Sequence, residues 1–270
     1  MSALTILHAW QRSVKEQLLP DLHGHQAKGL AAFSLALLWA AHCHSGRLEV
    51  AVAGRAKPAS VRRRLERLLA NRRLHAEPAL RQLARAVLAC CATGPLLLLL
   101  LDETPKGNAL RCLKVSLAYR GRAVPLLWVC YRPGAPPEPL PRLIWKLLRR
   151  LARCLPTQAP VLLLADRGLS WPLLVDLCRQ LGWHYLLRVQ SSTRLRLPDG
   201  REYALEQLAP RPGSRWTGSG QVFKKAGWRP AQVLATWERG CREPWLLITD
   251  LSASLGRCRQ YLKRTWTEMV

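Results

Sequence analysis

The chain has 270 residues and a strong positive charge, with 42 lysines and arginines against 17 acidic residues and a formal net charge of +25. An apolar content of 49% is ample for packed cores, in one large domain or two ordinary ones, and argues against a disordered chain. Because arginine recurs in nearly every segment, the charge favours a polyanionic partner, either nucleic acid or an anionic membrane surface. A compositional arginine bias without a DNA function is the alternative.

The cysteines, the histidines and the apolar stretches indicate where in the cell the protein is located. Nine cysteines, an odd number, are scattered without a C-x-x-C pair, which indicates reduced and mostly buried thiols of a cytosolic protein. The His-rich clusters around Gly24 and Cys43 lack a second cluster at zinc spacing, so they do not predict a zinc site. The apolar stretch at residues 30–41 is too short to span a bilayer, and no signal-peptide pattern precedes it. We therefore expect a cytoplasmic protein that does not bind membranes.

Residues 1–94 are predicted to form a helical DNA-binding region. Apolar residues recur at helical spacing in three stretches, residues 4–19, 27–43 and 77–91. Ser60 is placed to cap a further helix over residues 61–69. Arginines on the polar faces of that helix suit contacts with DNA phosphates, although a solvated charged face has the same pattern. The arginines concerned are Arg62, Arg63, Arg64 and Arg67.

Residues 95–190 are predicted to form a mixed α/β domain of ribonuclease H-like type. A continuous apolar run at 96–101 indicates a strand buried on both faces, and it ends on Asp102. Residues 161–165 repeat this pattern and end on Asp166. The elements expected around these two strands are strands over 110–119 and 123–131, helices over 143–155 and 171–181, and a strand over 183–189. We therefore expect Asp102 and Asp166 at the ends of neighbouring strands.

The last part of the chain is predicted to be a β-rich insertion over 191–250, followed by the start of a helix over 251–270. At 3.6 residues per turn, Tyr261, Arg264 and Glu268 share one face of that helix. A simple surface pair of Arg264 with Glu268 is the alternative interpretation.

Three acids, Asp102, Asp166 and Glu268, have the type and number needed to bind two Mg²⁺ ions, for which Mn²⁺ can substitute. Two such ions supply the activated oxygen nucleophile and the stabilised leaving oxygen that cleavage of a phosphodiester requires. Arg264 can hold a phosphate as a two-pronged donor. Taken alone, either aspartate is more readily explained as a strand-end cap or an ion-pair partner.

Several motifs occur together and in a fixed order from about residue 60 to the end. They are Leu-Leu-Asp102-Glu103-Thr104, the segment 119–128 (Tyr-Arg-Gly-Arg-Ala-Val-Pro-Leu-Leu-Trp), Leu-Leu-Ala-Asp166-Arg-Gly, Trp245-Leu-Leu-Ile-Thr249 and Tyr261-x-x-Arg264-x-x-x-Glu268. With these motifs the chain resembles the bacterial insertion-sequence-four-type DDE transposases. The resemblance implies a ribonuclease H-like core interrupted by a β-rich insertion before the third acid. It also implies cut-and-paste transposition through nicking, hairpin formation and opening, and strand transfer into target DNA.

The resemblance assigns roles to individual residues. Asp102, Asp166 and Glu268 become metal ligands, and Tyr261 and Arg264 become phosphate contacts at the transposon end. Trp245 becomes the tryptophan that receives a flipped base, a role that stacking on an aromatic ring makes reasonable. A core tryptophan at the start of a strand is the alternative for Trp245. The implied partners are double-stranded DNA, as terminal repeats and target, and a second copy of the full-length chain on that DNA.

One departure from the family pattern concerns the end of the chain. The family signature continues with a lysine seven residues after the glutamate, whereas this chain ends at Val270. We therefore expect a C-terminally truncated chain with weak or no transposition activity. The competing functions are a basic DNA-binding protein without catalysis and a ribonuclease H-like nuclease that does not join strands.

Overall fold

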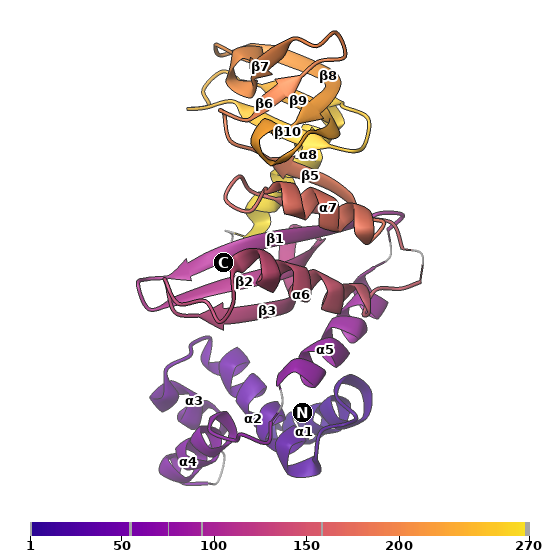
Figure 1. Ribbon diagram of the computed structural model, residues 1–270. Coiled ribbons are helices and arrows are strands. Elements are labelled where there is room, and N and C mark those ends of the chain that lie inside the picture. Colours follow the sequence, from indigo (N-terminus) through magenta and orange to yellow (C-terminus); the bar gives the residue numbers. More distant parts are fainter. Residues whose placement is uncertain (1, 54–55, 75, 93, 158, 268–270) are drawn as a thin grey trace. The chain divides into compact units, whose positions relative to one another are not determined.

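The computed structural model describes residues 2–53, 56–74, 76–92, 94–157 and 159–267. The chain divides into two compact units, Met1–Ala86 and Val87–Val270. The first contains only helices and the second contains a sheet with helices (Figure 1). The division falls within helix α5, close to the expected end of the helical region at residue 94. The predicted combination of a helical N-terminal region and a mixed α/β region is therefore confirmed.

The helices of the first unit follow apolar periodicity in the sequence. They are α1 (Ala3–Ser13), a π-helix (Val14–Leu18), α2 (Gly24–Ala40), α3 (Ser45–Val52), α4 (Pro58–Leu69) and α5 (Ala76–Cys91). The helices predicted over 4–19, 27–43, 61–69 and 77–91 are confirmed, with ends displaced by a few residues. Val61 and Leu65 of α4 are buried in one cluster with residues of α2 and α3. The arginines of α4 lie on its other, exposed side.

In this unit the sequence missed one helix, and one local prediction is wrong. Helix α3 was not predicted, because an eight-residue helix is too short to show a clear helical period in the sequence. Ser60 does not cap α4, since the helix begins at Pro58 and its N-cap is Lys57. Proline fits the first helical position because its φ is already helical and its missing N–H has no partner to lose there.

Within the described residues, ten strands form one mixed sheet in the order β3-β2-β1-β4-β5-β10-β9-β8-β6-β7. The first five are β1 (Leu97–Lys106), β2 (Leu110–Tyr119), β3 (Arg122–Tyr131), β4 (Val161–Ala165) and β5 (His184–Arg188). The others are β6 (Arg194–Arg196), β7 (Glu202–Ala204), β8 (Arg215–Val222), β9 (Arg229–Thr236) and β10 (Trp245–Thr249). Strands β1, β2 and β3 form the predicted antiparallel meander. Arg120 and Gly121 both have positive φ in the turn that joins β2 to β3, as tight hairpins require.

Strand β1 is longer than predicted. The sequence placed Asp102 at the end of the strand, but β1 continues to Lys106 and pairs with β2 along this whole second half. The parallel pairing with β4 ends at Leu101, so beyond it β1 has a neighbour on one side only. Pro105 is tolerated there because one edge of the strand needs no backbone donor.

The β-rich region over 191–250 extends the sheet of the core. Strand β10 pairs antiparallel with β5. Beyond β10 the sheet continues with β9, then β8, then β6. Two short 3₁₀ helices, Leu205–Leu208 and Lys224–Ala226, lie among these strands. Most of the regular secondary structure in the region is β-strand, as predicted. Its placement beside β5 removes a sheet edge that would otherwise expose unpaired backbone groups.

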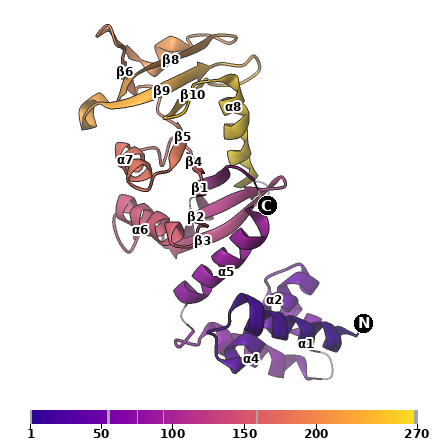
Figure 2. The ribbon, with the colours of Figure 1, turned by 90° about the vertical axis from the view of Figure 1, so that its right-hand side faces the viewer.

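Helices cover both faces of the sheet. Helices α6 (Leu140–Ala152) and α7 (Pro172–Gln180) lie on one side, and α8 (Leu255–Leu262) lies on the other (Figure 2). A C-terminal 3₁₀ helix (Lys263–Thr267) follows α8 and contacts β1, β2 and β3. The predicted α-helix over 251–270 is therefore correct only to Leu262, and Glu268 lies outside the described residues.

The core of the second unit is built from the leucine runs of β1 and β4. Leu99, Leu100 and Leu101 are fully buried, as are Leu162 and Leu163, which confirms the predicted strands buried on both faces. Among the helices in the described part of the chain, none combines the length and apolar character needed to cross a membrane.

We expect Leu162→Ala to lower the free energy of unfolding by about 2–5 kcal/mol, because Leu162 is 0% exposed within an apolar cluster. Leu173→Ala on α7 is the matched control, since Leu173 is 61% exposed and its truncation should change stability by less than about 0.5 kcal/mol. Urea denaturation followed by circular dichroism measures both. Equal effects of the two substitutions would contradict this description of the core.

Candidate functional site

The register of β1 against β4 brings two predicted aspartates together. The last parallel pair is Leu101 with Ala165. In each chain segment the residue that follows this pair is an aspartate, Asp102 after Leu101 and Asp166 after Ala165. Since parallel strands run in the same direction, these residues leave the paired region at the same edge. The prediction that the two acids lie at neighbouring strands is confirmed, with Asp102 inside the longer β1.

The Asp102 carboxylate is partly buried and surrounded by polar groups. The Thr104 hydroxyl donates a hydrogen bond to Asp102 Oδ2 at 2.7 Å. Lys114, the register partner of Asp102 on β2, places its Nζ 3.6 Å from the same oxygen. The other oxygen, Oδ1, lies 3.5 Å from Arg264 Nη1. The carboxylate is thus oriented by one hydroxyl and balanced by two cations.

The turn after β4 fixes the position of Asp166. The backbone N–H of Arg167 donates to Asp166 Oδ1 at 2.7 Å, and the Ser170 hydroxyl donates to the Asp166 carbonyl at 2.7 Å. Asp166 Oδ2 lies 3.9 Å from Arg264 Nη2. One guanidinium therefore approaches both aspartates.

Arg264 reaches this position from the C-terminal 3₁₀ helix. The Arg264 side chain is 12% exposed, against 14% for Asp102 and 36% for Asp166. The Lys114 ammonium also approaches the Thr267 carbonyl, with 3.5 Å between Nζ and O, so both cations tie the 3₁₀ helix to the acids. In this arrangement Arg264 pairs with the two carboxylates, whereas the sequence predicted a contact with DNA phosphate.

The described residues supply two of the three predicted metal ligands. Glu268, the third, lies outside them, and no group of three His, Cys, Asp or Glu side chains suited to a metal is found within the part of the chain that the structure describes. Asp102 and Asp166 offer hard carboxylate oxygens, the ligands that Mg²⁺ and Mn²⁺ prefer. Their pairing with one cationic group shows that this edge of the sheet accepts positive charge.

Tyr261 and Trp245 lie in the apolar layer beneath the acids. Tyr261 is 4% exposed and belongs to a cluster with leucines of β1, β4 and β10. Its ring packs edge-to-face on Trp245, with 5.5 Å between ring centroids and 73° between planes. Burial and the nearby Asp166 charge raise the pKa of Tyr261. In this structure Tyr261 therefore packs beside the site, whereas the resemblance assigns it a phosphate contact at the transposon end.

The arginines predicted to bind DNA lie on α4 in the other unit. Arg63, Arg64 and Arg67 are exposed. Arg62 instead pairs with the buried carboxylate of Glu49 on α3, and its Nη2 donates to Glu49 Oε1 at 2.6 Å. This pair holds the pKa of Glu49 below its usual value. Arg62 thus joins two helices, and the other three remain available to a partner.

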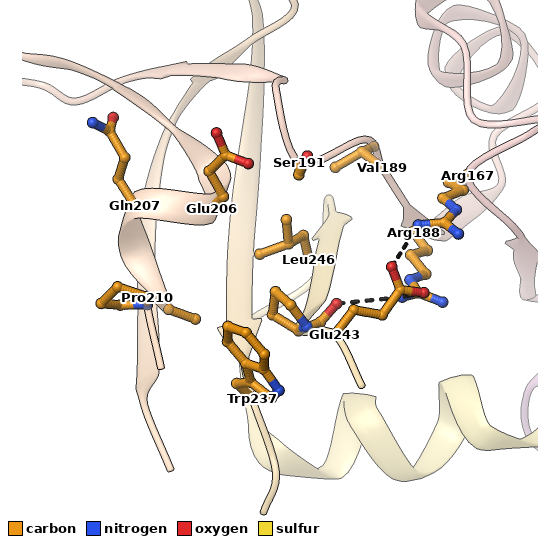
Figure 3. A pocket seen from close by; sticks show the side chains of 12 residues that line it. Arg167, Arg188, Val189, Ser191, Glu206, Gln207, Pro210, Trp237, Glu243 and Leu246 are labelled. Carbon is orange, nitrogen blue, oxygen red and sulfur yellow. Dashed lines mark hydrogen bonds and ion pairs between the residues drawn. The ribbon is translucent and has the colours of Figure 1, made fainter. Parts of the chain in front are cut away.

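A cavity of about 480 Å³ lies next to the turn that carries Asp166 (Figure 3). Glu243 bridges two arginines on its wall, with 2.7 Å to Arg167 Nη1 and 2.7 Å to Arg188 Nη2. Trp237 forms part of another wall. Because side chains alternate along a strand, the neighbours of Trp245 line this cavity and Trp245 itself packs against Tyr261.

Sequence reasoning missed several groups that the structure brings to the site. Lys114 is the clearest of them, since a lone lysine between Leu113 and Val115 in an apolar strand is a detectable signal. Its place opposite Asp102 depends on the strand register, which the sequence alone does not provide. Arg188 and Glu243 carry no comparable local signal, because their pairing joins segments far apart in the chain.

Comparison with models of known protein families gives no match for this chain, and comparison with curated proteins gives none either.

A double-mutant cycle tests whether Arg264 and Asp102 are coupled. We expect Arg264→Gln and Asp102→Asn to show a coupling free energy of about 1–3 kcal/mol in urea denaturation, since both groups are largely shielded from solvent. Asp199 and Arg201 form the control pair. Their atoms are closer, at 2.6 Å, but the side chains are 46% and 67% exposed, so solvent screening should limit the coupling to about 0.2–1 kcal/mol. A coupling for Arg264 and Asp102 no larger than that of the control would show that the ion pair contributes little.

Proposed function

We propose that this chain is a DNA transposase of the DDE type, with Asp102 and Asp166 in its catalytic site. The observation that carries the proposal is their position, one residue beyond the last pair of two neighbouring parallel strands. Two motifs far apart in the sequence predicted this proximity. The meander of β1, β2 and β3, followed by helix, strand, helix and strand, is the element order expected of a ribonuclease H-like core and supports the same proposal.

The donor set at the site fits a divalent cation. Asp102 and Asp166 would hold the metal ions, together with Glu268, which lies outside the described residues. Bound there, two Mg²⁺ or Mn²⁺ ions would supply an activated oxygen nucleophile and stabilise the leaving oxygen. The structure supports the fit through two carboxylates that approach the same guanidinium.

The chain's own residues have separate tasks in this proposal. Thr104 and the Arg167 N–H orient the two carboxylates through their hydrogen bonds. Lys114 and Arg264 place positive charge beside the acids, which favours the approach of a DNA phosphate. Arg264 is suited to this because its planar guanidinium can exchange a carboxylate for a phosphate as a two-pronged partner.

The partners in this proposal are duplex DNA, as transposon ends and as target, and a second copy of the protein on that DNA. The net charge of +25 supports a polyanionic partner. Arg63, Arg64 and Arg67 on the exposed side of α4 would contact phosphates.

A basic DNA-binding protein without catalysis is the second candidate. One observation favours it, namely the neutralisation of both aspartates by Arg264 and Lys114 within the chain. In that case the acids stabilise the fold and bind no metal. The two candidates differ in metal binding and in cleavage, and both can be measured.

We expect Asp102→Asn and Asp166→Asn each to reduce Mg²⁺- or Mn²⁺-dependent nicking of supercoiled plasmid by about a hundredfold or more. The metal ions contribute several kcal/mol to such a reaction, and each 1.4 kcal/mol or so corresponds to a factor of ten. The same substitutions should weaken Mn²⁺ binding measured by electron paramagnetic resonance. DNA affinity should stay the same or rise, because a negative charge is removed.

Asp199→Asn is the matched control for this experiment. It removes an equally charged side chain from an exposed pair with Arg201, so it changes the net charge without touching the site. Nicking at the parent's rate by both site variants, or no Mn²⁺ binding by the parent chain, would leave the non-catalytic candidate in place.

We expect Arg63→Gln and Arg64→Gln to weaken DNA binding and to flatten its salt dependence. Each lost phosphate contact should reduce the slope of log affinity against log salt concentration by about 0.9. Fluorescence anisotropy with a labelled duplex at several salt concentrations measures this slope. An unchanged slope in the double variant would show that α4 presents only a solvated charged face.

Arg62→Gln provides the contrast within the same helix. Because Arg62 holds the buried Glu49, its loss should lower the thermal stability of the helical unit. The pKa of Glu49 is lowered by this pair, so the stabilisation is present above the ordinary glutamate pKa and is lost as the pH falls below it. The stability difference between parent and Arg62→Gln should therefore be large at neutral pH and disappear in acid.

A further inference from the structure

Two cysteines lie directly opposite each other on neighbouring strands. Cys112 on β2 and Cys130 on β3 are register partners in the antiparallel pair. Such partners have Cα atoms about 4.5 or 5.5 Å apart, depending on their place in the hydrogen-bonding pattern. Both values fall within the range of roughly 4.4–6.8 Å that a disulfide can join. The strand register therefore places the two thiols within bonding reach without movement of the backbone.

The two thiols differ in their access to solvent. Cys130 is exposed, on the outermost strand of the sheet, and Cys112 is partly buried on the next strand inward. Burial and a hydrogen bond with the Cys130 side chain raise the pKa of Cys112 to about 11. The interaction supports the proximity that the register implies. A dissolved reagent would meet Cys130 first and would leave Cys112 as the second thiol.

The other cysteines provide a comparison. Cys154 and Cys178 are buried, so a dissolved reagent cannot reach them readily. Cys241 is exposed like Cys130, but it lies outside the strands and faces no register partner. Cys241 is therefore the matched control for an exposed thiol without a neighbouring thiol.

The cysteine pair lies on the same face of the sheet as the candidate acid site. Thr104 is the register partner of Cys112, and Asp102 is the partner of Lys114, two residues along β2. Residues two apart in a strand project to the same face, about 6.6–6.8 Å from each other. Lys114 and Cys112 therefore follow one another on the less buried side of β2, between the acids and the edge strand.

We propose that Cys112 and Cys130 form a redox-active dithiol, which a small-molecule disulfide such as oxidised glutathione converts reversibly into a Cys112–Cys130 disulfide. The Cys130 thiolate attacks one sulfur of the reagent, forms a mixed disulfide and releases one reduced thiol. The Cys112 sulfur then attacks the Cys130 sulfur, the bond to the reagent breaks, and a second reduced thiol leaves. The protein loses two electrons and two protons, which the two released thiols carry. The inference rests on the register and is independent of the proposed transposase activity.

Peptide mapping of the oxidised chain tests the proposal. The 270-residue chain is incubated with oxidised glutathione, its free thiols are blocked with an alkylating reagent, and trypsin cleavage is followed by mass spectrometry. We expect a linked pair of peptides, residues 112–114 and 123–142, which reduction with dithiothreitol separates. In concentrated urea the link should form at least about tenfold more slowly, because the register no longer aligns the two sulfurs.

Serine variants distinguish the two steps. Cys112→Ser should accumulate a glutathione adduct on Cys130, because the second thiol is missing. Cys130→Ser should show neither the link nor, in the same time, an adduct on Cys112. Cys241→Ser should form the 112–130 link at the parent's rate. Circular dichroism confirms that each variant keeps the fold of the parent.

Measurements on the unsubstituted chain test the proposal even if a serine variant does not fold. Glutathione adducts on Cys130 and Cys241 in equal amounts, with no link between residues 112 and 130, would overturn the proposal. A link that forms equally fast in folded and urea-unfolded protein would also overturn it, since the strand register would then play no part.

Discussion

The parallel pairing of β1 with β4 determines where the groups of the candidate site lie. Leu101 stands opposite Ala165, and the two aspartates follow at once. The leucines before them are fully buried on both faces of the sheet. A shift of one residue in either strand would turn every side chain to the opposite face and move a carboxylate towards the apolar layer. The packing of the leucines therefore holds the acids together, and the cost of burying a charge opposes any other register.

Two carboxylates held this close repel each other unless positive charge lies nearby. Arg264 and Lys114 supply that charge within the chain. Arg264 comes from the C-terminal 3₁₀ helix, and Lys114 contacts the carbonyl of Thr267 in the same helix. The position of the chain's last described helix is thus linked to the charge of the acids. Metal ions and these side chains would compete for the same carboxylate oxygens, and the guanidinium of Arg264 has the right chemistry to bind a DNA phosphate in place of a carboxylate.

The sequence predicted the buried strands well, because continuous leucine runs between turn residues leave few alternatives. The range 110–119 agrees with β2, and 161–165 with β4. The extension of β1 through Pro105 could not be predicted, since aspartate and proline are depleted in strands and the pairing of Asp102 and Pro105 with β2 is not visible in the sequence. Helical spacing placed Tyr261 and Arg264 together, but it did not show that one enters the core and the other meets the acids. The fate of each depends on which side chain the sheet beneath it can accept, and that information is tertiary.

Strand β2 links the candidate acid site to the cysteine pair, because it pairs with β1 on one side and with β3 on the other. β2 is paired on both sides, with β1 and β3, whereas β3 is the outermost strand. A covalent bond between Cys112 and Cys130 would therefore restrain β3, the strand with fewer neighbours, and leave the pairing of β1 with β4 as it is. Asp102 and Asp166 follow directly on the last residues of that second pairing, but Asp102 also faces Lys114 of β2. Because Lys114 lies two residues from Cys112, oxidation of the thiols would reinforce the edge of the sheet through the same strand that carries the ion pair with Asp102.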